Sequence, residues 1–183
     1  MTVEELLAAI RSAQPESRTA AWTQAGSVGP QALRPLAELL AHTDQEVARA
    51  AKHAMWKITR TVGAPGATDK SAAIGELANL LADAQSTVVR REVLWMLSEI
   101  GDASCVPAMS RSLLDAELHD DGRMALERIP GPESLAALQE AFERAPEALK
   151  YPLAQALRDR GATVAGYACQ KLVPQRETTV RPL

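Results

Sequence analysis

The chain repeats a short apolar phrase, and this repetition restricts its fold more than any other feature. The clearest copy reads Val-Val-Arg-Arg-Glu-Val-Leu-Trp-Met-Leu-Ser-Glu-Ile-Gly at 88–101, and weaker copies lie at 47–59, 118–130 and 149–161. Each copy begins with an aliphatic residue and has leucine or methionine eight residues later. Repeats of about 20–50 residues are typical of stacked units that cannot bury their apolar faces alone. The sequence therefore predicts a stack of small units rather than one closed globule.

The residues between the phrases indicate that each unit is a helical hairpin. Apolar residues recur every three or four positions ahead of the phrase, as at Leu33, Leu36 and Leu40, which is the spacing of one helix face. Hydrophobic residues make up 46% of the chain but aromatic residues only 3%, whereas sheets favour β-branched and aromatic residues. We therefore predict an all-α fold, an α-α superhelix (right-handed solenoid) in which each unit has a first helix and a second helix.

Glycine and proline divide a single predicted domain, residues 1–172, into about five units. Glycine commonly ends one helix and proline favours the start of the next, and both fall between units, as at Gly29-Pro30. The predicted units span about 3–26, 30–60, 71–101, 104–130 and 133–161. We predict an insertion loop over 61–70, a further helix that can form over 162–172, and an extended or disordered tail over 173–183. Ser71 and Ser134 are predicted to cap helix N-termini.

Charge and targeting signals limit the expected partners and compartment. The formal net charge is −3, and the lack of a basic excess argues against binding nucleic acid through its phosphates. The N-terminal residues do not resemble a secretory signal, and no stretch approaches the ~18 apolar residues of a membrane span. Cys105 and Cys169 form neither a metal-binding spacing nor a CxxC pair. We therefore expect a cytoplasmic protein with no nucleic-acid or membrane partner.

A family resemblance rests on two phrases. Residues 100–109 read Ile-Gly-Asp-Ala-Ser-Cys-Val-Pro-Ala-Met, and Leu33-Arg34-Pro35-Leu36 matches their second half in another unit. With the phrase at 88–101, they resemble the HEAT repeat family, and more closely the bacterial HEAT-like repeats first described in phycobilisome lyases. The resemblance covers about 28–161. It implies a solenoid whose second helices line a concave side, and a family made mostly of interaction scaffolds with a few enzymes.

The chain departs from this family's pattern at a few positions. Lys52 and Glu92 stand where the repeats have small or variable residues, and Gly122-Arg123 replaces a pair of alanines. Arg160 replaces the terminal isoleucine of the last unit. Because an outer repeat has no further neighbour to pack against, Arg160 is predicted to face solvent as part of an end cap.

One stripe of the second helices is the candidate binding surface. Residues four and three apart are neighbours on a helix, and stacking would place them side by side across units. Arginine and aromatic residues are enriched where proteins bind proteins. We therefore predict a groove with an aromatic and basic half in units two and three and a more acidic half in units four and five. The alternative is that Trp56 and Trp95 pack between adjacent units. The predicted partner-binding residues are Arg49, His53, Trp56, Arg91, Trp95, Asp120, Met124 and Tyr151.

No constellation of residues indicates catalysis, a metal or a cofactor. The sequence contains no GxSxG, P-loop or GxGxxG motif, and its three histidines, His42, His53 and His119, are scattered. Carboxylates at the start of a helix favourably meet its dipole, so the cluster His119-Asp120-Asp121 is interpreted as capping. Cys105 lies near a predicted helix N-terminus, where a thiol pKa can be lowered, but a semi-buried structural cysteine fits better. We expect no catalytic residue, metal or cofactor.

The amino-acid sequence is compatible with three functions. The repeats and the stripe favour a non-catalytic scaffold or adaptor, a monomer that binds a protein partner. The family resemblance implies an alternative, a bilin (tetrapyrrole) lyase or chaperone-like subunit, for which Arg49, His53, Arg91 and Trp95 would meet propionates and rings. A HEAT-like DNA-base glycosylase is a remote alternative, and it would need a basic concave face with a catalytic carboxylate beside aromatic residues.

Overall fold

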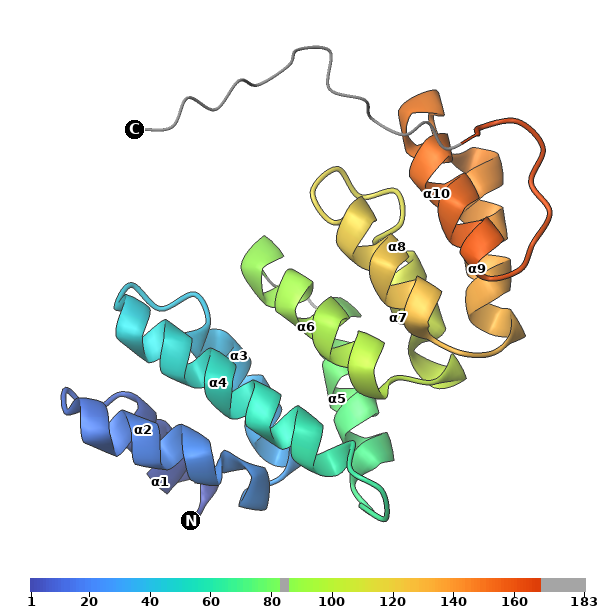
Figure 1. Cartoon of the computed structure of the whole chain (residues 1–183). Coiled ribbons are helices and arrows are strands. Elements are labelled where there is room, and N and C mark those ends of the chain that lie inside the picture. The colour runs from blue at the N-terminus through green and yellow to red at the C-terminus, as the bar shows by residue number, and fades with distance from the viewer. Residues whose placement is uncertain (83–85, 169–183) are drawn as a thin grey trace, which may run out of the picture.

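The computed structural model describes residues 1–82 and 86–168, in which all regular secondary structure is helical. The elements are α1 (Val3–Ile10), α2 (Pro15–Gln24), η1 (Ala25–Ser27), η2 (Pro30–Ala32), α3 (Leu33–Leu39), α4 (Gln45–Val62), α5 (Lys70–Ala82), α6 (Thr87–Ile100), η3 (Ala103–Cys105), α7 (Val106–Ser110), α8 (His119–Arg128), α9 (Pro132–Arg144) and α10 (Glu147–Asp159), where η marks a short 3-10 helix. They pair as consecutive hairpins, and the even-numbered second helices form one row with the first helices behind them (Figure 1). The predicted all-α solenoid of five hairpins is confirmed.

The second helices form because a polar cap precedes an apolar face of helical spacing. In α4, the Asp44 side chain accepts a hydrogen bond from the backbone N–H of Glu46 at 2.8 Å. In α6, the Ser86 hydroxyl accepts from the N–H of Val89. Such caps satisfy N–H groups that have no partner within the helix. The α4 helix continues to Val62, past the predicted end of its unit, and this extension shapes the candidate site.

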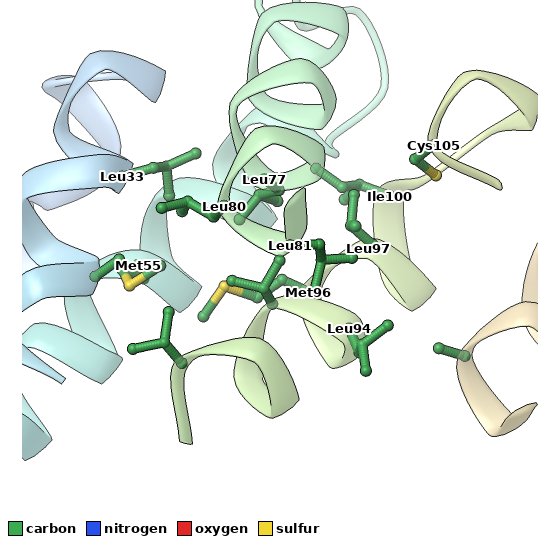
Figure 2. Packing of buried hydrophobic residues seen from close by; sticks show 14 of the residues in the cluster. Leu33, Met55, Leu77, Leu80, Leu81, Leu94, Met96, Leu97, Ile100 and Cys105 are labelled. Carbon is green, nitrogen blue, oxygen red and sulfur yellow. The ribbon is translucent and has the colours of Figure 1, made fainter. Parts of the chain in front are cut away.

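The core runs continuously from hairpin to hairpin, as a solenoid requires. Figure 2 shows its middle, where Leu77 and Leu80 of α5 pack with Leu97 of α6 and approach Leu33 of the preceding hairpin. All of these side chains are buried. Burying one such side chain is worth roughly 1.5–3 kcal/mol, so each hairpin depends on its neighbours for much of its stability.

Two glycines lie where neighbouring segments approach closely, one between hairpins and one within a hairpin. A Cβ atom at Gly101 would lie 2.5 Å from the Leu97 carbonyl oxygen and 2.8 Å from Cys105 Sγ. A Cβ atom at Gly122 would lie 2.8 Å from the Cβ of Ser112. Gly122 is one of the departures from the family pattern, and it lets α8 lie directly against the segment that follows α7.

Both N-cap predictions are wrong. Helix α5 begins at Lys70, so Ser71 lies inside it, and α9 begins at Pro132 with Gly131 as its N-cap. Proline suits the first helical position because its fixed φ fits the helix and its missing N–H has no partner there anyway. Ser134 is buried, and its hydroxyl donates to the carbonyl of Ile129 at 2.7 Å.

The last helix is followed by a segment that folds back instead of continuing as a helix. Residues 162–168 are not helical, so the helix predicted over 162–172 does not form there. The Arg158 guanidinium donates to the carbonyls of Val164 and Tyr167, at 3.1 and 2.9 Å. The Tyr167 ring contacts Phe142 of α9 edge-on, with ring centroids 5.4 Å apart. Residues 169–172 and the predicted tail at 173–183 lie outside the described residues.

Asp115 organises the turn between α7 and α8. Its carboxylate accepts hydrogen bonds from the backbone N–H groups of Glu117 and Leu118, at 2.9 and 3.2 Å. It also pairs with Arg90 of α6 at 3.1 Å. The bond from the Glu117 N–H, with a smaller contribution from Arg90, lowers the pKa of Asp115 below its ordinary value.

This lowered pKa predicts a specific loss of stability in acid. A carboxyl group whose pKa is lower in the folded than in the unfolded state adds stability above its unfolded pKa and loses it as the pH falls through the folded value. The urea midpoint should therefore drop between about pH 5 and about pH 3, and Asp115→Asn should reduce that drop. Asp120→Asn, which changes an exposed carboxylate on the same hairpin, serves as control. An equal drop for the wild type and Asp115→Asn would contradict the prediction.

Candidate functional site

One carboxylate ties Trp56 and Lys52 of α4 to the next hairpin. The Trp56 indole N–H donates to Glu92 Oε2 at 3.1 Å, and the Lys52 ammonium pairs with the same carboxylate. Lys52 and Trp56 are four residues apart, so they lie on one face of α4. Lys52 and Glu92 both depart from the family pattern, and together they form a contact between α4 and α6.

Asp121 of α8 joins Arg91 and Trp95 of α6 in the same way. The Trp95 indole N–H donates to Asp121 Oδ1 and the Arg91 Nε–H donates to Asp121 Oδ2, both at 2.9 Å. The hydrogen bond to Asp121 raises the pKa of Arg91. Asp121 follows Glu92 by 29 residues, the step that also separates the last isoleucines of the two repeated phrases. The two acceptors therefore occupy equivalent repeat positions.

The hydrogen bonds to Glu92 and Asp121 show how the two tryptophans contribute to the fold. Trp56 and Trp95 both bridge adjacent hairpins, as the packing alternative predicts. Trp95 and Arg91 are half-buried and share their acceptor. The side chain of Asp121 is only 17% exposed. Trp56 differs from Trp95, because Trp56 also lines an open hollow.

This hollow, which we call the α2/α4 hollow, lies between the second helices of the first two hairpins. It has a volume of about 540 Å³ and is lined by Trp22, His53, Trp56, Lys57, Arg60 and Thr61. The Trp22 and His53 rings meet edge-on with centroids 5.1 Å apart. The Arg60 guanidinium lies over the Trp56 ring, 4.9 Å from its centroid. Aromatic walls under a basic rim are thus gathered on the row of second helices.

A smaller hollow adjoins it along the same two helices. This hollow has a volume of about 240 Å³ and is lined by Pro15, Arg18, Thr19, Trp22, Glu46, Arg49, Ala50 and His53. Trp22 and His53 line both hollows, so their ring pair stands between them. Arg49 is exposed and pairs with Glu46 of its own helix at 2.6 Å. We call these two adjoining hollows together the depression between α2 and α4.

The predicted residues of the last two hairpins do not join this depression. Met124 and Tyr151 are 40% and 53% exposed, and the Tyr151 ring contacts Tyr167 with centroids 5.2 Å apart. Asp120 is exposed, and its Oδ1 atom lies 3.6 Å from Arg123 Nε. Of the eight predicted residues, the structure gathers three, Arg49, His53 and Trp56, around the two hollows. Arg91 and Trp95 are instead held together with Asp121.

Sequence reasoning missed four residues of the larger hollow. Trp22 belongs to the first unit, where the repeated phrase is weakest, so no offset placed it on the stripe. Lys57 lies within the phrase but at none of the offsets that defined the stripe, and Arg60 and Thr61 follow the end of the phrase on the last turn of α4. The available signal was the i, i+4, i+7 spacing of His53, Lys57 and Arg60, which places all three on one side of the helix.

Other reactive groups in the described residues do not extend the site. No group of three His, Cys, Asp or Glu side chains in residues 1–82 and 86–168 is arranged to hold a metal ion. Cys105 is fully buried, and this burial raises the pKa of its thiol. Cys169 lies outside the described residues. None of the described helices has the length and apolarity needed to cross a membrane.

Comparison with known proteins finds no matching family model and no matching curated protein. Solved structures do match. A designed armadillo repeat protein in complex with the peptide (KR)4 is 23% identical, over 84% of this chain and 80% of that chain, with a TM-score of 0.49. A computationally designed armadillo repeat protein for modular peptide recognition is 20% identical over the same shares, with a TM-score of 0.47. An engineered protein is 21% identical, over 86% of this chain and 78% of that chain, with a TM-score of 0.46. The chain is similar to these proteins as a repeat helical solenoid.

Proposed function

We propose that this chain is a non-catalytic scaffold of the HEAT-like repeat type that binds a protein partner on its row of second helices. The α2/α4 hollow is the observation that carries the proposal. Its volume falls within the roughly 300–1,000 Å³ of typical binding pockets. Its lining combines tryptophan and arginine, two of the residue types that dominate binding energy at protein interfaces.

The rest of the row supports the same function by holding this surface in place. The bonds through Glu92 and Asp121 join three successive second helices, α4, α6 and α8. A surface that is already ordered loses less conformational freedom when a partner binds. The solenoid therefore acts as a rigid support, and the hollow between α2 and α4 receives the partner.

Site-specific photocrosslinking tests this proposal directly. Benzoyl-phenylalanine replaces Lys57, which lines the hollow, and in a second variant it replaces Glu38, an exposed residue of α3 in the row of first helices. After irradiation in lysate of the source organism, we expect a discrete crosslinked protein band from position 57 and none from position 38. Mass spectrometry of the band identifies the partner.

The matched positions make a negative result informative. Equal crosslinking from positions 57 and 38 would show that the probe captures proteins without regard to the surface. Crosslinking from position 38 alone would place the binding surface on the first helices. Circular dichroism of both variants, with unchanged helical signal and melting temperature, confirms that neither substitution disturbs the fold.

A further inference from the structure

We infer that the segment bound in the α2/α4 hollow is acidic and carries an apolar anchor side chain. This inference rests on the proposed function and specifies the chemistry of the partner. It follows from three properties of the depression between α2 and α4: its charge, its walls and its length.

The charge of the depression is concentrated on α4. This helix carries four Lys or Arg residues and a single acidic residue, Glu46, although the whole chain has a formal net charge of −3. The larger hollow is lined by Lys57 and Arg60 and by no carboxylate. Complementary charge guides association and fixes the register of a bound segment.

Part of this positive charge remains available to a partner. Lys52 is neutralised by Glu92, and Arg49 by Glu46. Arg60 lies 3.5 Å from Glu99, but its side chain is 66% exposed. Lys57 is exposed and forms no ion pair within the described part of the chain. Lys57 and Arg60 are therefore the groups that a carboxylate of the partner would meet.

The walls of the larger hollow fit an apolar side chain. Trp22 and Trp56 are half-buried and pack against the core, and both expose ring surface to the hollow. An anchor residue that fills such an aromatic pocket and excludes water supplies much of the affinity at protein interfaces. A polar segment without an anchor would leave this ring surface exposed to water.

The length of the depression matches a short linear segment. Along α4 the two hollows extend from Glu46 to Thr61, which at 1.5 Å per residue is about 22 Å. An extended chain covers this distance in about seven residues. The Trp22 and His53 rings divide the depression, so an anchor on the Thr61 side places the rest of the segment over the smaller hollow.

Fluorescence anisotropy with defined peptides tests the inference on the full chain. The probe is the labelled peptide Gly-Asp-Glu-Phe-Asp-Glu-Leu-Gly. One comparison peptide has lysine at every acidic position, and another has serine in place of phenylalanine and leucine. We expect the acidic apolar peptide to bind about tenfold more tightly than either. Binding should weaken as salt is added, because exposed charges are screened.

Charge reversal in the protein supplies the matched control. Lys57→Glu should weaken binding of the acidic peptide about tenfold and improve binding of the lysine peptide. Arg111→Glu makes the same charge change at an exposed residue that lines a separate hollow on the first-helix side, and it should leave both affinities unchanged. If both variants lose the same affinity for the acidic peptide, the effect comes from the net charge of the protein and not from the hollow. That result would overturn the inference.

The remaining outcomes also decide the question. The inference is overturned if the acidic peptide does not bind, if the lysine peptide binds equally well, or if a labelled oligothymidylate of similar length binds more tightly. Crosslinking at position 57 reports separately whether any protein docks there. If a protein is crosslinked at position 57 but the acidic peptide binds no more tightly than the lysine peptide, the proposed scaffold function stands. Only the inference that the bound segment is acidic would then be rejected.

Discussion

Replacing Arg160 with alanine is expected to lower the free energy of unfolding by about 3 kcal/mol. Arg160 is the C-cap residue of α10. Its guanidinium reaches back to the end of α8, where it donates to the carbonyls of Leu126 at 3.1 Å and Ile129 at 2.7 Å. It also donates to the Gly131 carbonyl and the Ser134 hydroxyl, both at 2.9 Å. The positive charge lies where the dipole of α8 is negative, so its loss removes several charge-assisted hydrogen bonds to the end of α8 at once.

Two further variants separate geometry from charge in this prediction. Arg160→Lys keeps the charge, but a single ammonium cannot reproduce the planar fork of five N–H donors, so it should recover less than half of the loss. Arg144→Ala removes an arginine that is 67% exposed and that, among the residues that the structure describes, forms an ion pair only with Glu140 of its own helix. This variant should cost under about 0.5 kcal/mol. Urea unfolding followed by circular dichroism measures all three. An Arg160→Ala midpoint equal to that of Arg144→Ala would refute this role.

Arg160 also shows what the sequence could and could not predict. The repeated phrases of units two to four have isoleucine as their last aliphatic residue, and arginine at the equivalent position of the last unit predicts exposure to solvent. The structure instead has Arg160 half-buried against the preceding hairpin. Apolar periodicity reveals which helix face is buried, but it contains no information on where a long polar side chain finds its acceptors in another repeat.

The all-α solenoid was predictable because it depends on repeated local signals. Helix-spaced leucines, Gly and Pro breakers and the recurring phrase are each visible within one unit, and stacking follows from the apolar face that each unit must bury. The departures at Lys52, Glu92 and Gly122 were visible too, but their roles were not. The ion pair of Lys52 with Glu92 becomes clear only when two hairpins are placed side by side. The close approach of Gly122 to Ser112 becomes clear only when α8 is placed against the segment that follows α7.

The candidate site was predicted in part for the same reason. His53 and Trp56 lie on the copy of the phrase in the second unit, so repeat offsets placed them on one surface. The offsets also placed Arg91 and Trp95 there, but they could not show that Asp121 would engage both. Trp22 completes the hollow from a unit whose phrase is too weak to align. A depression between two helices depends on their separation, which sequence periodicity does not specify.

Asp121→Ala is expected to lower the free energy of unfolding by about 2 kcal/mol, because it leaves the Trp95 indole N–H and the Arg91 guanidinium without their shared acceptor. Asp120→Ala is the matched control. It removes a neighbouring carboxylate from the same first turn of α8, so both variants lose a similar interaction with the helix dipole. The Asp120 side chain is 62% exposed and 3.6 Å from Arg123, so its loss should cost under about 0.5 kcal/mol.

A double-mutant cycle assigns the effect of Asp121 to the contact between α6 and α8. Trp95→Phe keeps an aromatic ring but removes the indole N–H, and its coupling to Asp121→Ala should be about 1 kcal/mol. Chemical unfolding of the two single variants and the double variant provides this value. Additive losses would show that Asp121 and Trp95 act independently, and equal losses from Asp121→Ala and Asp120→Ala would reduce the role of Asp121 to helix capping. A clear coupling would instead show that the shared carboxylate joins adjacent repeats and holds the row of second helices in place.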